Sequence, residues 1–268
     1  MIIKEIESSS LINKSQLPEV DYVANPYVGC GHGCVYCYAR FMKRFTGHQE
    51  VWGEFVDVKM NAEQLAEKEL RKVGEKTVLL SSVTDPYQPI ERKYQLTRKV
   101  LQQAVINHTP ISILTKSSLV LRDLDLLSQL DYCEVGMSFS TAEDSVRRVF
   151  EPRTSTVDQR LNALIEIKGV GIRTYAFLGP ILPGLTDLET LFEQFARVRV
   201  DWVMVENLNM EGTIFPSLTE TIQKHYPHLA ELYYQIKRKP RDYWDPIRTE
   251  ISELANKYQL PVRLYFNH

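Results

Sequence analysis

Cysteine spacing restricts what this chain can fold around more than any other feature of its sequence. Three of the four cysteines, Cys30, Cys34 and Cys37, fall within eight residues in the pattern Cys-x3-Cys-x2-Cys, with glycines between and beside them. Glycine lets a short loop adopt positive φ, so that several thiolates can approach one point. Because soft thiolates select iron–sulfur clusters, zinc or copper(I), the segment predicts a metal centre.

A fourth protein ligand for this centre is not evident. A structural zinc site normally has four protein ligands, and an ordinary cubane cluster takes four cysteines. Three thiolates therefore indicate a cluster with one iron left open for a small molecule. The alternative is a nucleic-acid-binding module whose cysteines hold a structural zinc or iron–sulfur centre, with a fourth ligand such as His32 or His48.

Composition and charge exclude few classes of protein. With 268 residues, of which 44% are hydrophobic and 25% charged, the chain has room for one large α/β barrel or two modest domains. The formal net charge of −2 lacks the basic excess of a dedicated duplex-DNA binder, and the basic clusters at 147–153 and 237–241 are typical of a solvated face. Charge therefore neither supports nor excludes a nucleic-acid partner.

Two further observations concern the cellular location. The chain has no run of about 18 apolar residues, and its start lacks the basic and then apolar profile of a signal peptide. Few, clustered cysteines suit a reducing interior better than a disulfide framework. We therefore expect a cytoplasmic protein without a membrane span.

Short apolar runs alternate with helical patterns along most of the chain. We expect strands at 22–28, 77–81, 111–116, 133–140, 173–178, 202–206 and 261–266. Helices are expected between them and at 38–45, 217–236 and 242–258, with an extra strand at 51–60 and N-caps at Asn61, Thr156 and Thr186. This alternation predicts a parallel sheet of six βα units, and the pattern alone leaves an open Rossmann-type sheet as an alternative.

Polar residues gather where the apolar runs stop. These ends carry the segments 81–87, 115–117, 138–140, 178–184 and 206–209. In parallel α/β sheets and barrels, ligands bind at the carboxyl ends of the strands. We therefore expect a functional rim at this edge of the sheet.

The cysteine segment resembles the signature of the radical S-adenosylmethionine (SAM) superfamily, in which an aromatic residue, here Tyr36, precedes the third cysteine. The flanking residues 25–27 (Asn-Pro-Tyr) and 38–40 (Tyr-Ala-Arg) make it similar to the spore photoproduct lyase-related branch, whose members are often labelled DNA repair photolyases. The resemblance implies an α/β fold with a partial (β/α)6 TIM-type barrel and a C-terminal helical extension. It also implies a [4Fe-4S] cluster on the three cysteines, SAM as a cofactor, and a low-potential electron donor of flavodoxin or ferredoxin type.

The domain organisation follows from this fold. We expect residues 1–20 to form an irregular N-terminal flap and residues 21–212 to form the partial barrel. Residues 213–268 should add C-terminal helices and a closing strand to the same domain.

The resemblance also places SAM at the expected rim. It implies that the segment 81–85 meets the methionyl amine, that Lys116 meets the carboxylate, and that Ser138 or Ser140 meets the ribose. The full set of implied contacts is Tyr36, Ser81, Thr84, Asp85, Lys116, Ser138, Ser140, Glu151, Arg153 and Gly179. Plainer interpretations stay open: Lys116 could be a surface cation, and Glu151 with Arg153 could form an exposed ion pair worth under about 1 kcal/mol.

The implied activity is radical initiation. One electron from the reduced cluster cleaves SAM to methionine and a 5′-deoxyadenosyl radical, which abstracts hydrogen from the substrate. Tyr38 is a catalytic candidate that either faces the substrate or packs against a helix. The enzyme would be lyase- or transferase-like, and its substrate could be a nucleic-acid lesion, an RNA nucleotide or a small molecule.

The chain departs from spore photoproduct lyase at the cysteine that donates hydrogen. The segment 80–85, which we align with that position, contains serines and no cysteine. Cys133 starts the fourth expected strand, and about seven residues of strand span roughly 23 Å. We therefore expect Cys133 at the opposite end from the rim, as a buried small apolar residue, and we do not predict thymine-dimer reversal.

Overall fold

The main β-sheet runs through the protein, which a computed structural model describes from residue 1 to residue 266. Its eight strands follow the order β11-β10-β9-β8-β7-β6-β3-β2. Neighbouring strands are parallel, except that β2 and β3 are antiparallel. The strands are β2 (Ile12–Lys14), β3 (Tyr22–Ala24), β6 (Val78–Leu80), β7 (Ile111–Thr115), β8 (Cys133–Phe139), β9 (Arg173–Leu178), β10 (Trp202–Glu206) and β11 (Val262–Tyr265).

The central strands are short apolar runs, as is typical of parallel strands that are buried on both faces. β6 is buried throughout, and β8 is buried except at Glu134. The register places Ile111 opposite Cys133, and Met137 opposite Ala176. Neighbouring parallel strands therefore end together, and their carboxyl ends form one rim.

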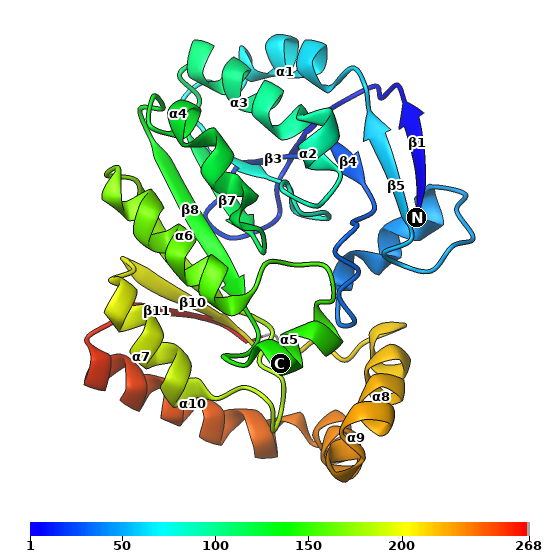
Figure 1. Ribbon diagram of the computed structural model, residues 1–268, viewed down its shortest axis with the longest axis vertical. Coiled ribbons are helices and arrows are strands. Elements are labelled where there is room, and N and C mark those ends of the chain that lie inside the picture. Colours follow the sequence, from blue (N-terminus) through cyan, green and yellow to red (C-terminus); the bar gives the residue numbers. More distant parts are fainter. Residues whose placement is uncertain (267–268) are drawn as a thin grey trace.

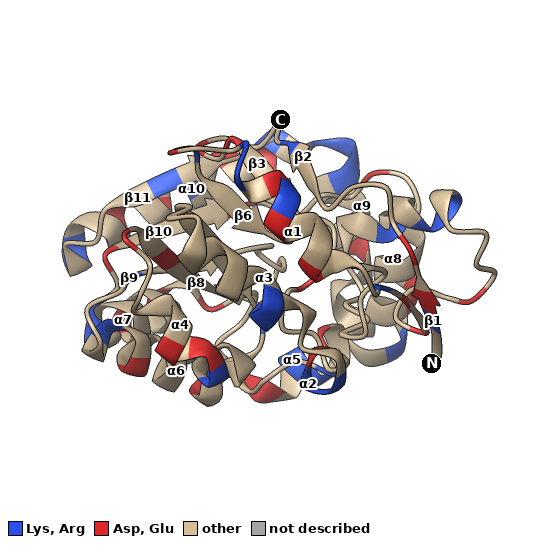
Figure 2. Cartoon of the chain, turned by 90° about the horizontal axis from the view of Figure 1, so that it is seen from above, with Lys and Arg blue, Asp and Glu red and all other residues tan. Residues whose placement is uncertain are grey.

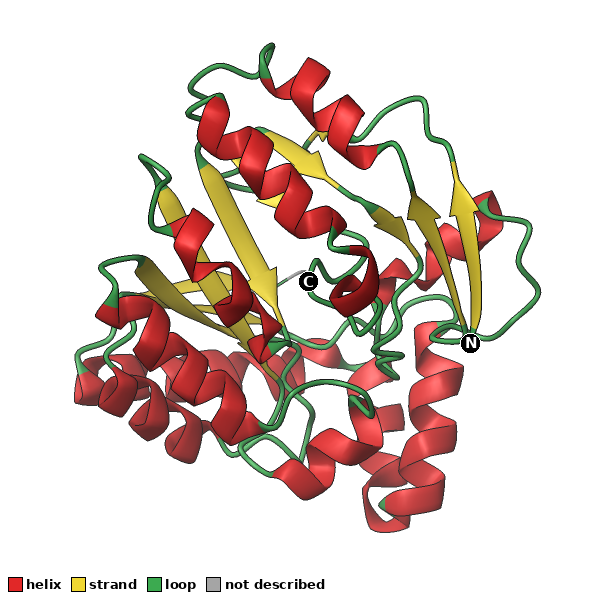
Figure 3. Cartoon of the chain, turned by 45° about the horizontal axis from the view of Figure 1, so that its top comes forward, coloured by secondary structure: helices red, strands yellow, loops and turns green. Residues whose placement is uncertain are grey.

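Helices line the outside of this sheet in the order of the strands (Figures 1 and 3). The α-helices are α1 (Ala62–Leu70), α2 (Glu91–Tyr94), α3 (Leu96–Ile106), α4 (Leu124–Leu127), α5 (Asp144–Phe150), α6 (Val157–Gly169), α7 (Leu188–Val198), α8 (Ile214–His225), α9 (Ala230–Arg238) and α10 (Pro240–Tyr258). The 3-10 helices are η1 (Tyr38–Phe45), η2 (Ser118–Asp123) and η3 (Pro227–Leu229). α6 packs against β8 and β9, and α7 packs against α6 and α10.

The sheet is open. Within residues 1–266, β2 and β11 lie at its two ends and do not pair with each other. The strands β3, β6, β7, β8, β9 and β10 are each followed by helical segments before the next strand of the parallel series. This arrangement confirms the expected partial (β/α)6 architecture with a C-terminal helical extension.

The N-terminal segment differs from the irregular flap that we expected at 1–20. It contains β1 (Ile2–Ile6) as well as β2, and β1 pairs in parallel with β5 (Phe55–Lys59). β5 also pairs with β4 (Tyr27–Val28), which gives a second, three-stranded sheet and divides the expected strand at 22–28 between two sheets. Because β1 is largely exposed, no buried apolar pattern marks it in the sequence.

Two of the three expected caps do not form as predicted. Asn61 is the N-cap residue of α1, but its side chain makes no capping hydrogen bond and instead exchanges hydrogen bonds with the backbone of Ser8. Thr186 donates to a loop carbonyl, and Asp187 caps α7 in its place. Thr156 forms the expected capping box at α6. In both failures the polar side chain has a tertiary partner that the local pattern does not show.

The C-terminal helices also differ in detail. The expected helix at 217–236 is divided into α8, η3 and α9, while the helix at 242–258 and the closing strand are present as α10 and β11.

No helix within residues 1–266 is both long and apolar enough to cross a membrane. Figure 2 shows Lys and Arg interspersed with Asp and Glu over the outer helices, in keeping with the small net charge. The domain boundaries near residues 20 and 212 stay predictions.

Candidate functional site

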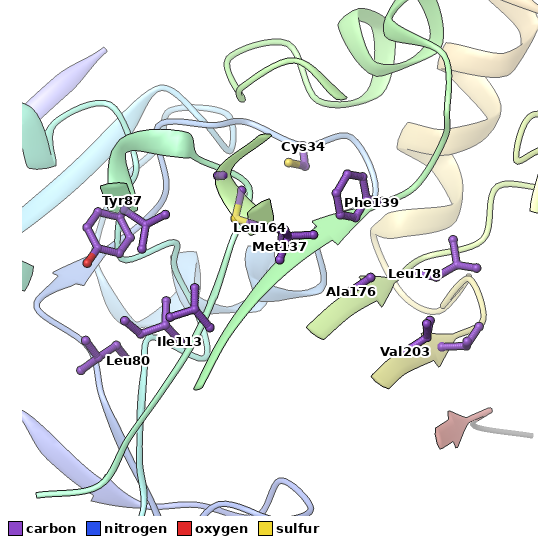
Figure 4. Close-up of a cluster of buried hydrophobic side chains, with 14 of the residues drawn as sticks. Cys34, Leu80, Tyr87, Ile113, Met137, Phe139, Leu164, Ala176, Leu178 and Val203 are labelled. Atoms are coloured by element: carbon purple, nitrogen blue, oxygen red, sulfur yellow. The ribbon is translucent and has the colours of Figure 1, made fainter. Parts of the chain in front are cut away.

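The cysteine loop, residues 29–37, lies between β4 and η1, and side chains that follow β6 bond to it. Cys30 and Cys34 are buried, and Cys37 is half-buried. Backbone hydrogen bonds of 3.3 Å, from Gly33 N to Cys30 O and from Cys37 N to Cys34 O, fold the loop into successive turns. In Figure 4 the Cys34 side chain is drawn near the arrowhead of β8, the strand that carries Phe139.

Side chains that follow β6 hold the cysteine loop in place. The Thr84 hydroxyl donates to the carbonyl of Gly29 at 2.6 Å. The Gln88 side chain accepts from Gly31 N at 2.7 Å and donates to the Thr84 hydroxyl at 2.8 Å. Thr84, which was expected to contact SAM, therefore uses its hydroxyl on the cysteine loop, and its contact with SAM stays a prediction.

Asp85 joins the cysteine loop to β7. Its carboxylate accepts from Thr115 Oγ1 at 2.6 Å and from Lys116 N at 2.9 Å, and His32 Nδ1 lies 3.4 Å away. Burial would raise the pKa of Asp85, but His32 and these hydrogen bonds hold it at about 2. Burial acts to lower the pKa of His32, yet Asp85 raises it to about 9. Asp85 is therefore a fixed, fully paired anion of the rim.

Lys116 extends from the end of β7 toward the other expected site residues. Its Nζ donates to Ser138 Oγ at 2.8 Å and lies 5.8 Å from the centroid of the Tyr36 ring. The Ser138 hydroxyl in turn donates to the carbonyl of Gly179 at 3.3 Å. Burial raises the pKa of the Cys34 thiol well above its ordinary value, and Lys116 acts in the opposite direction. Lys116 is thus a half-buried cation beside the cysteine loop rather than a surface cation.

Glu151 is a second buried anion at the rim. It accepts hydrogen bonds from the Tyr36 hydroxyl and, at 2.8 Å, from Ser140 Oγ, and it pairs with the Arg160 guanidinium. Burial would raise the pKa of Glu151, but Arg160 and Lys116 hold it at about 2. Glu151 and Arg160 are both almost inaccessible to solvent. This ion pair therefore fixes Tyr36 and Ser140 in place.

Arg153 lies apart from this group. It donates to Glu54 Oε1 at 2.9 Å and to the carbonyl of Gly53 at 2.7 Å. A Cβ on Gly33 would lie 2.7 Å from Arg153 Nη2, so the guanidinium packs against the cysteine loop. The suggested ion pair between Glu151 and Arg153 is wrong, because each residue has another partner. Arg153 fastens the cysteine loop to the segment before β5.

Ser81 and Tyr38 are two more of the residues that were expected at the site. Ser81 has a φ of +67°, in the left-handed region, and its buried Oγ has no hydrogen-bond partner within residues 1–266. A buried hydroxyl without a partner is an atom that a polar ligand would satisfy. The half-exposed Tyr38 donates its hydroxyl to the carbonyl of Ser82, which places it beside the segment after β6.

Sequence reasoning missed Arg160 as part of the site, and it placed Glu206 at the expected rim without assigning it a role. Arg160 belongs to α6 and has no local signal that distinguishes it from an exposed helical arginine. Glu206 ends β10, where burial raises its pKa and Lys116 acts in the opposite direction. Its place at a strand end was a usable signal. Cys133 is buried at the amino end of β8, opposite the rim, as expected.

The suggested histidine ligands have other partners. His32 faces Asp85, and the ring nitrogens of His48 lie 2.8 Å from Asp57 and 2.9 Å from Glu50. Within residues 1–266, no three or more His, Cys, Asp and Glu side chains are grouped so as to hold a single metal ion. Both suggested histidine ligands are therefore engaged by carboxylates in the described part of the chain.

The three thiols fit an iron–sulfur cluster better. Burial raises the pKa of the Cys37 thiol to about 11, with a further contribution from Cys30. The charges of Cys30 and Cys37 also raise the pKa of Cys34, so the three thiols interact electrostatically. Their donor set, soft and one ligand short of a closed zinc site, fits an iron–sulfur cluster.

Comparison with known proteins identifies the family. The sequence model of the Radical SAM superfamily matches residues 24–195, which is more than half of the chain. The chain belongs to the radical SAM superfamily. This radical SAM protein is 34% identical over 230 residues to an uncharacterized protein of Methanocaldococcus jannaschii, with 86% of each chain covered. It is 26% identical over 247 residues to the radical SAM Nalpha-GlyT isomerase of Pseudomonas phage M6, covering 88% of this chain and 51% of the isomerase.

Solved structures show the same radical SAM fold. Spore photoproduct lyase complexed with dinucleoside spore photoproduct has a TM-score of 0.70 at 17% identity, over 99% of this chain and 82% of the lyase. A lyase variant with bound AdoMet has a TM-score of 0.70 at 16% identity, over the same shares of the two chains. At this level of identity the likeness shows the fold, and membership of the superfamily implies SAM and an iron–sulfur cluster.

Proposed function

We propose that this protein is a radical SAM enzyme that holds a [4Fe-4S] cluster on Cys30, Cys34 and Cys37, cleaves SAM and abstracts hydrogen from a substrate. The observation that carries the proposal is the position of Lys116. The charge of this half-buried side chain acts to lower the pKa of the buried Cys34 thiol. Its Nζ lies 5.8 Å from the centroid of the Tyr36 ring. A cation, a set of soft thiolates and an aromatic face are what the carboxylate, the cluster and the adenine of SAM would require.

The rim residues then have distinct roles. Lys116 would neutralise the carboxylate of SAM, and the unpaired Ser81 hydroxyl would accept from its amine. Ser138 and Ser140 would meet the ribose hydroxyls, with Gly179 beside them. When bound, the cluster supplies the electron that splits SAM to the 5′-deoxyadenosyl radical. A flavodoxin- or ferredoxin-type donor would deliver that electron.

The surrounding residues hold these groups in a fixed geometry. Asp85 ties the end of β7 to the cysteine loop, and the Glu151–Arg160 pair fixes Tyr36. Because both anions are already paired inside the protein, they are suited to positioning rather than to proton transfer. Such a preorganised frame holds reacting groups without reorganisation during the reaction.

For the substrate we propose a nucleic-acid lesion or modified base. The similar spore photoproduct lyase was solved with a dinucleoside photoproduct, and the similar phage protein is named a Nalpha-GlyT isomerase. The half-exposed Tyr38 ring at the segment after β6 would face this substrate. An RNA nucleotide and a small molecule are the competing substrate classes, and the chemistry is lyase- or transferase-like.

Anaerobic reconstitution tests the cofactor proposal. We expect about four irons per chain and release of 5′-deoxyadenosine from SAM with dithionite. Cys34→Ala should lose both, whereas Lys116→Gln should keep its iron and raise the KM for SAM about 10- to 100-fold, the cost of one charge-assisted hydrogen bond. Lys224→Gln, at an exposed residue of α8, is the matched control. Bound zinc in place of iron, or no 5′-deoxyadenosine, would support the structural-metal alternative.

A labelled panel tests the substrate proposal. Deuterated dinucleoside photoproducts, DNA and RNA oligonucleotides and free nucleosides would each be incubated with the reduced enzyme and SAM. We expect deuterium in 5′-deoxyadenosine only with the nucleic-acid members that carry a lesion or modified base. Transfer from free nucleosides alone would overturn this choice of substrate class.

A further inference from the structure

Arg40 is a charged residue beside the cysteine loop that the proposed function does not use. It lies in η1, three residues after Cys37, and is half-buried. Its Nη2 donates to the carbonyl of Cys34 at 3.3 Å. Its buried Nε has no hydrogen-bond partner within residues 1–266. The guanidinium is thus held against the loop, with one donor left to satisfy.

The pKa of Arg40 also reflects its position beside the cysteines. Burial lowers the pKa of its guanidinium, while Cys37 and Cys34 act in the opposite direction. Arginine nevertheless keeps its charge in proteins. In the described part of the chain no carboxylate lies within ion-pair distance of Arg40, so no anion of the protein neutralises it.

We propose that Arg40 sets the reduction potential of the cluster by placing an uncompensated positive charge beside its ligands. Adding an electron makes the cluster more negative, so a neighbouring cation stabilises the reduced state. Net charge and hydrogen bonds near the sulfurs are the means by which proteins tune such potentials. This inference rests on the proposed function, because it requires the cluster on Cys30, Cys34 and Cys37.

Two other sources of positive charge are distinguishable from Arg40. Lys116 is bonded to Ser138 on the side where SAM is proposed to bind. Arg44 belongs to the same 3-10 helix as Arg40 but is exposed, with its guanidinium over the Phe45 ring at 4.6 Å. Because water screens an exposed charge, Arg44 should influence the cluster little. Arg44 is therefore a matched control for the loss of one positive charge from this helix.

The test is a potentiometric titration of the reconstituted cluster, followed by electron paramagnetic resonance in the absence of SAM. Wild type, Arg40→Gln, Arg40→Lys and Arg44→Gln would be compared at equal iron content. For Arg40→Gln we expect the equilibrium constant for reduction to fall about tenfold, a shift of about 59 mV to more negative potential for one electron. Arg40→Lys should recover most of this shift, and Arg44→Gln should titrate like wild type.

Each alternative result has a definite meaning. Equal potentials for Arg40→Gln and wild type would overturn the inference and leave Arg40 a structural support of the Cys34 carbonyl. Should Arg40→Gln fail to hold iron, Arg40→Met is the second neutral variant. If neither neutral variant assembles a cluster while Arg40→Lys does, the charge serves assembly and the inference is overturned. Failure of the wild type to assemble a cluster would instead refute the proposed function.

Discussion

At the scale of single residues, the candidate site is held by buried charges that are each paired. Asp85 faces His32, and Glu151 faces Arg160. The pKa of both carboxyl groups is held at about 2, so both are ionised over the working range of an enzyme. Removing one partner of a buried pair leaves an uncompensated charge, which costs about 3–5 kcal/mol. These residues should therefore be among the least replaceable in the protein.

The first prediction concerns Glu151→Gln in cluster-free protein. At pH 7 we expect the free energy of unfolding to fall by about 3 kcal/mol, because Arg160 stays buried without its anion. The folded-state pKa of about 2 lies below the ordinary 4.5, so this group stabilises the wild type fully above about pH 5 and loses its effect as the pH falls to 2. The difference between the two proteins should therefore shrink from about pH 5 to pH 2, as measured by urea unfolding.

A matched control is available on the same helix as Arg160. Glu166 is an exposed residue of α6, so Glu166→Gln should change the free energy of unfolding by no more than about 0.5 kcal/mol. A difference between Glu151→Gln and wild type that does not vary with pH would show that the carboxylate contributes through packing and not through charge.

The sequence predicted part of this site for a physical reason. Parallel strands end at one rim, so Lys116, Ser138 and Gly179 could be brought together from the ends of separate strands, and they form one chain of hydrogen bonds. The partners of Arg153 and Arg160 could not be found in this way. Arg153 reaches residues about 100 positions earlier, and Arg160 bonds from a helix whose pattern gives no sign of a buried charge.

At the scale of elements, the contact between β8 and β9 restricts side-chain size. Gly136 pairs with Tyr175, and a Cβ on Gly136 would lie 2.2 Å from the tyrosine ring. The Tyr175 hydroxyl donates to the carbonyl of Ile113 at 3.1 Å, and the ring stacks on Trp202 with centroids 5.0 Å apart. The ring therefore has no room to move away.

The second prediction follows from this contact. Gly136→Ala should lower the free energy of unfolding by about 2–3 kcal/mol, because overpacking forces the ring or the strand to shift. Gly169→Ala, in α6 with nothing within 4 Å of the added Cβ, should be neutral or stabilising by up to about 1 kcal/mol. Urea unfolding of both variants measures the difference, and equal stability of the two would contradict the packing argument.

The third prediction concerns the start of α7. Asp187 accepts from Thr190 N at 2.9 Å as the N-cap, so Asp187→Ala should lower the free energy of unfolding by about 1 kcal/mol. Glu193→Ala, at an exposed position of the same helix, should change it by no more than about 0.5 kcal/mol. Thermal unfolding of both variants provides the measurement. A larger effect at Glu193 than at Asp187 would show that the cap bond contributes nothing.

The elements that the sequence predicted are those whose pattern is local. The buried strands β7, β9 and β10 are apolar runs within one residue of their expected bounds. β1 could not be found, because its exposed Ile-Ile-Lys-Glu-Ile sequence pairs with β5 through the backbone alone. Asn61 was misread because a cap and a tertiary contact require the same kind of side chain.

At the scale of the whole molecule, the cysteine loop is supported by protein contacts rather than by a metal alone. Thr84, Gln88 and Arg153 bond to the loop or pack on it, and each comes from a different part of the chain than the cysteines. One cluster of buried hydrophobic side chains joins the main sheet to its helices, and it includes Cys34. The loop should therefore keep its place in the fold when no cluster is bound.

The fourth prediction is that the chain folds without its cluster. A variant with Cys30→Ala, Cys34→Ala and Cys37→Ala should bind no iron, yet keep its far-ultraviolet circular dichroism and unfold cooperatively in urea. We expect the free energy of unfolding to fall by about 1 kcal/mol for each thiol, because each substitution removes one sulfur from a buried or half-buried place.

Cys133→Ala is the control for this prediction. It removes a buried thiol at the amino end of β8, away from the rim, and should lower the free energy of unfolding by a similar amount while iron binding is retained. Loss of cooperative unfolding in the triple variant alone would mean that the metal is part of the core, as in small zinc domains, and that the contacts from Thr84 and Arg153 do not suffice to hold the loop.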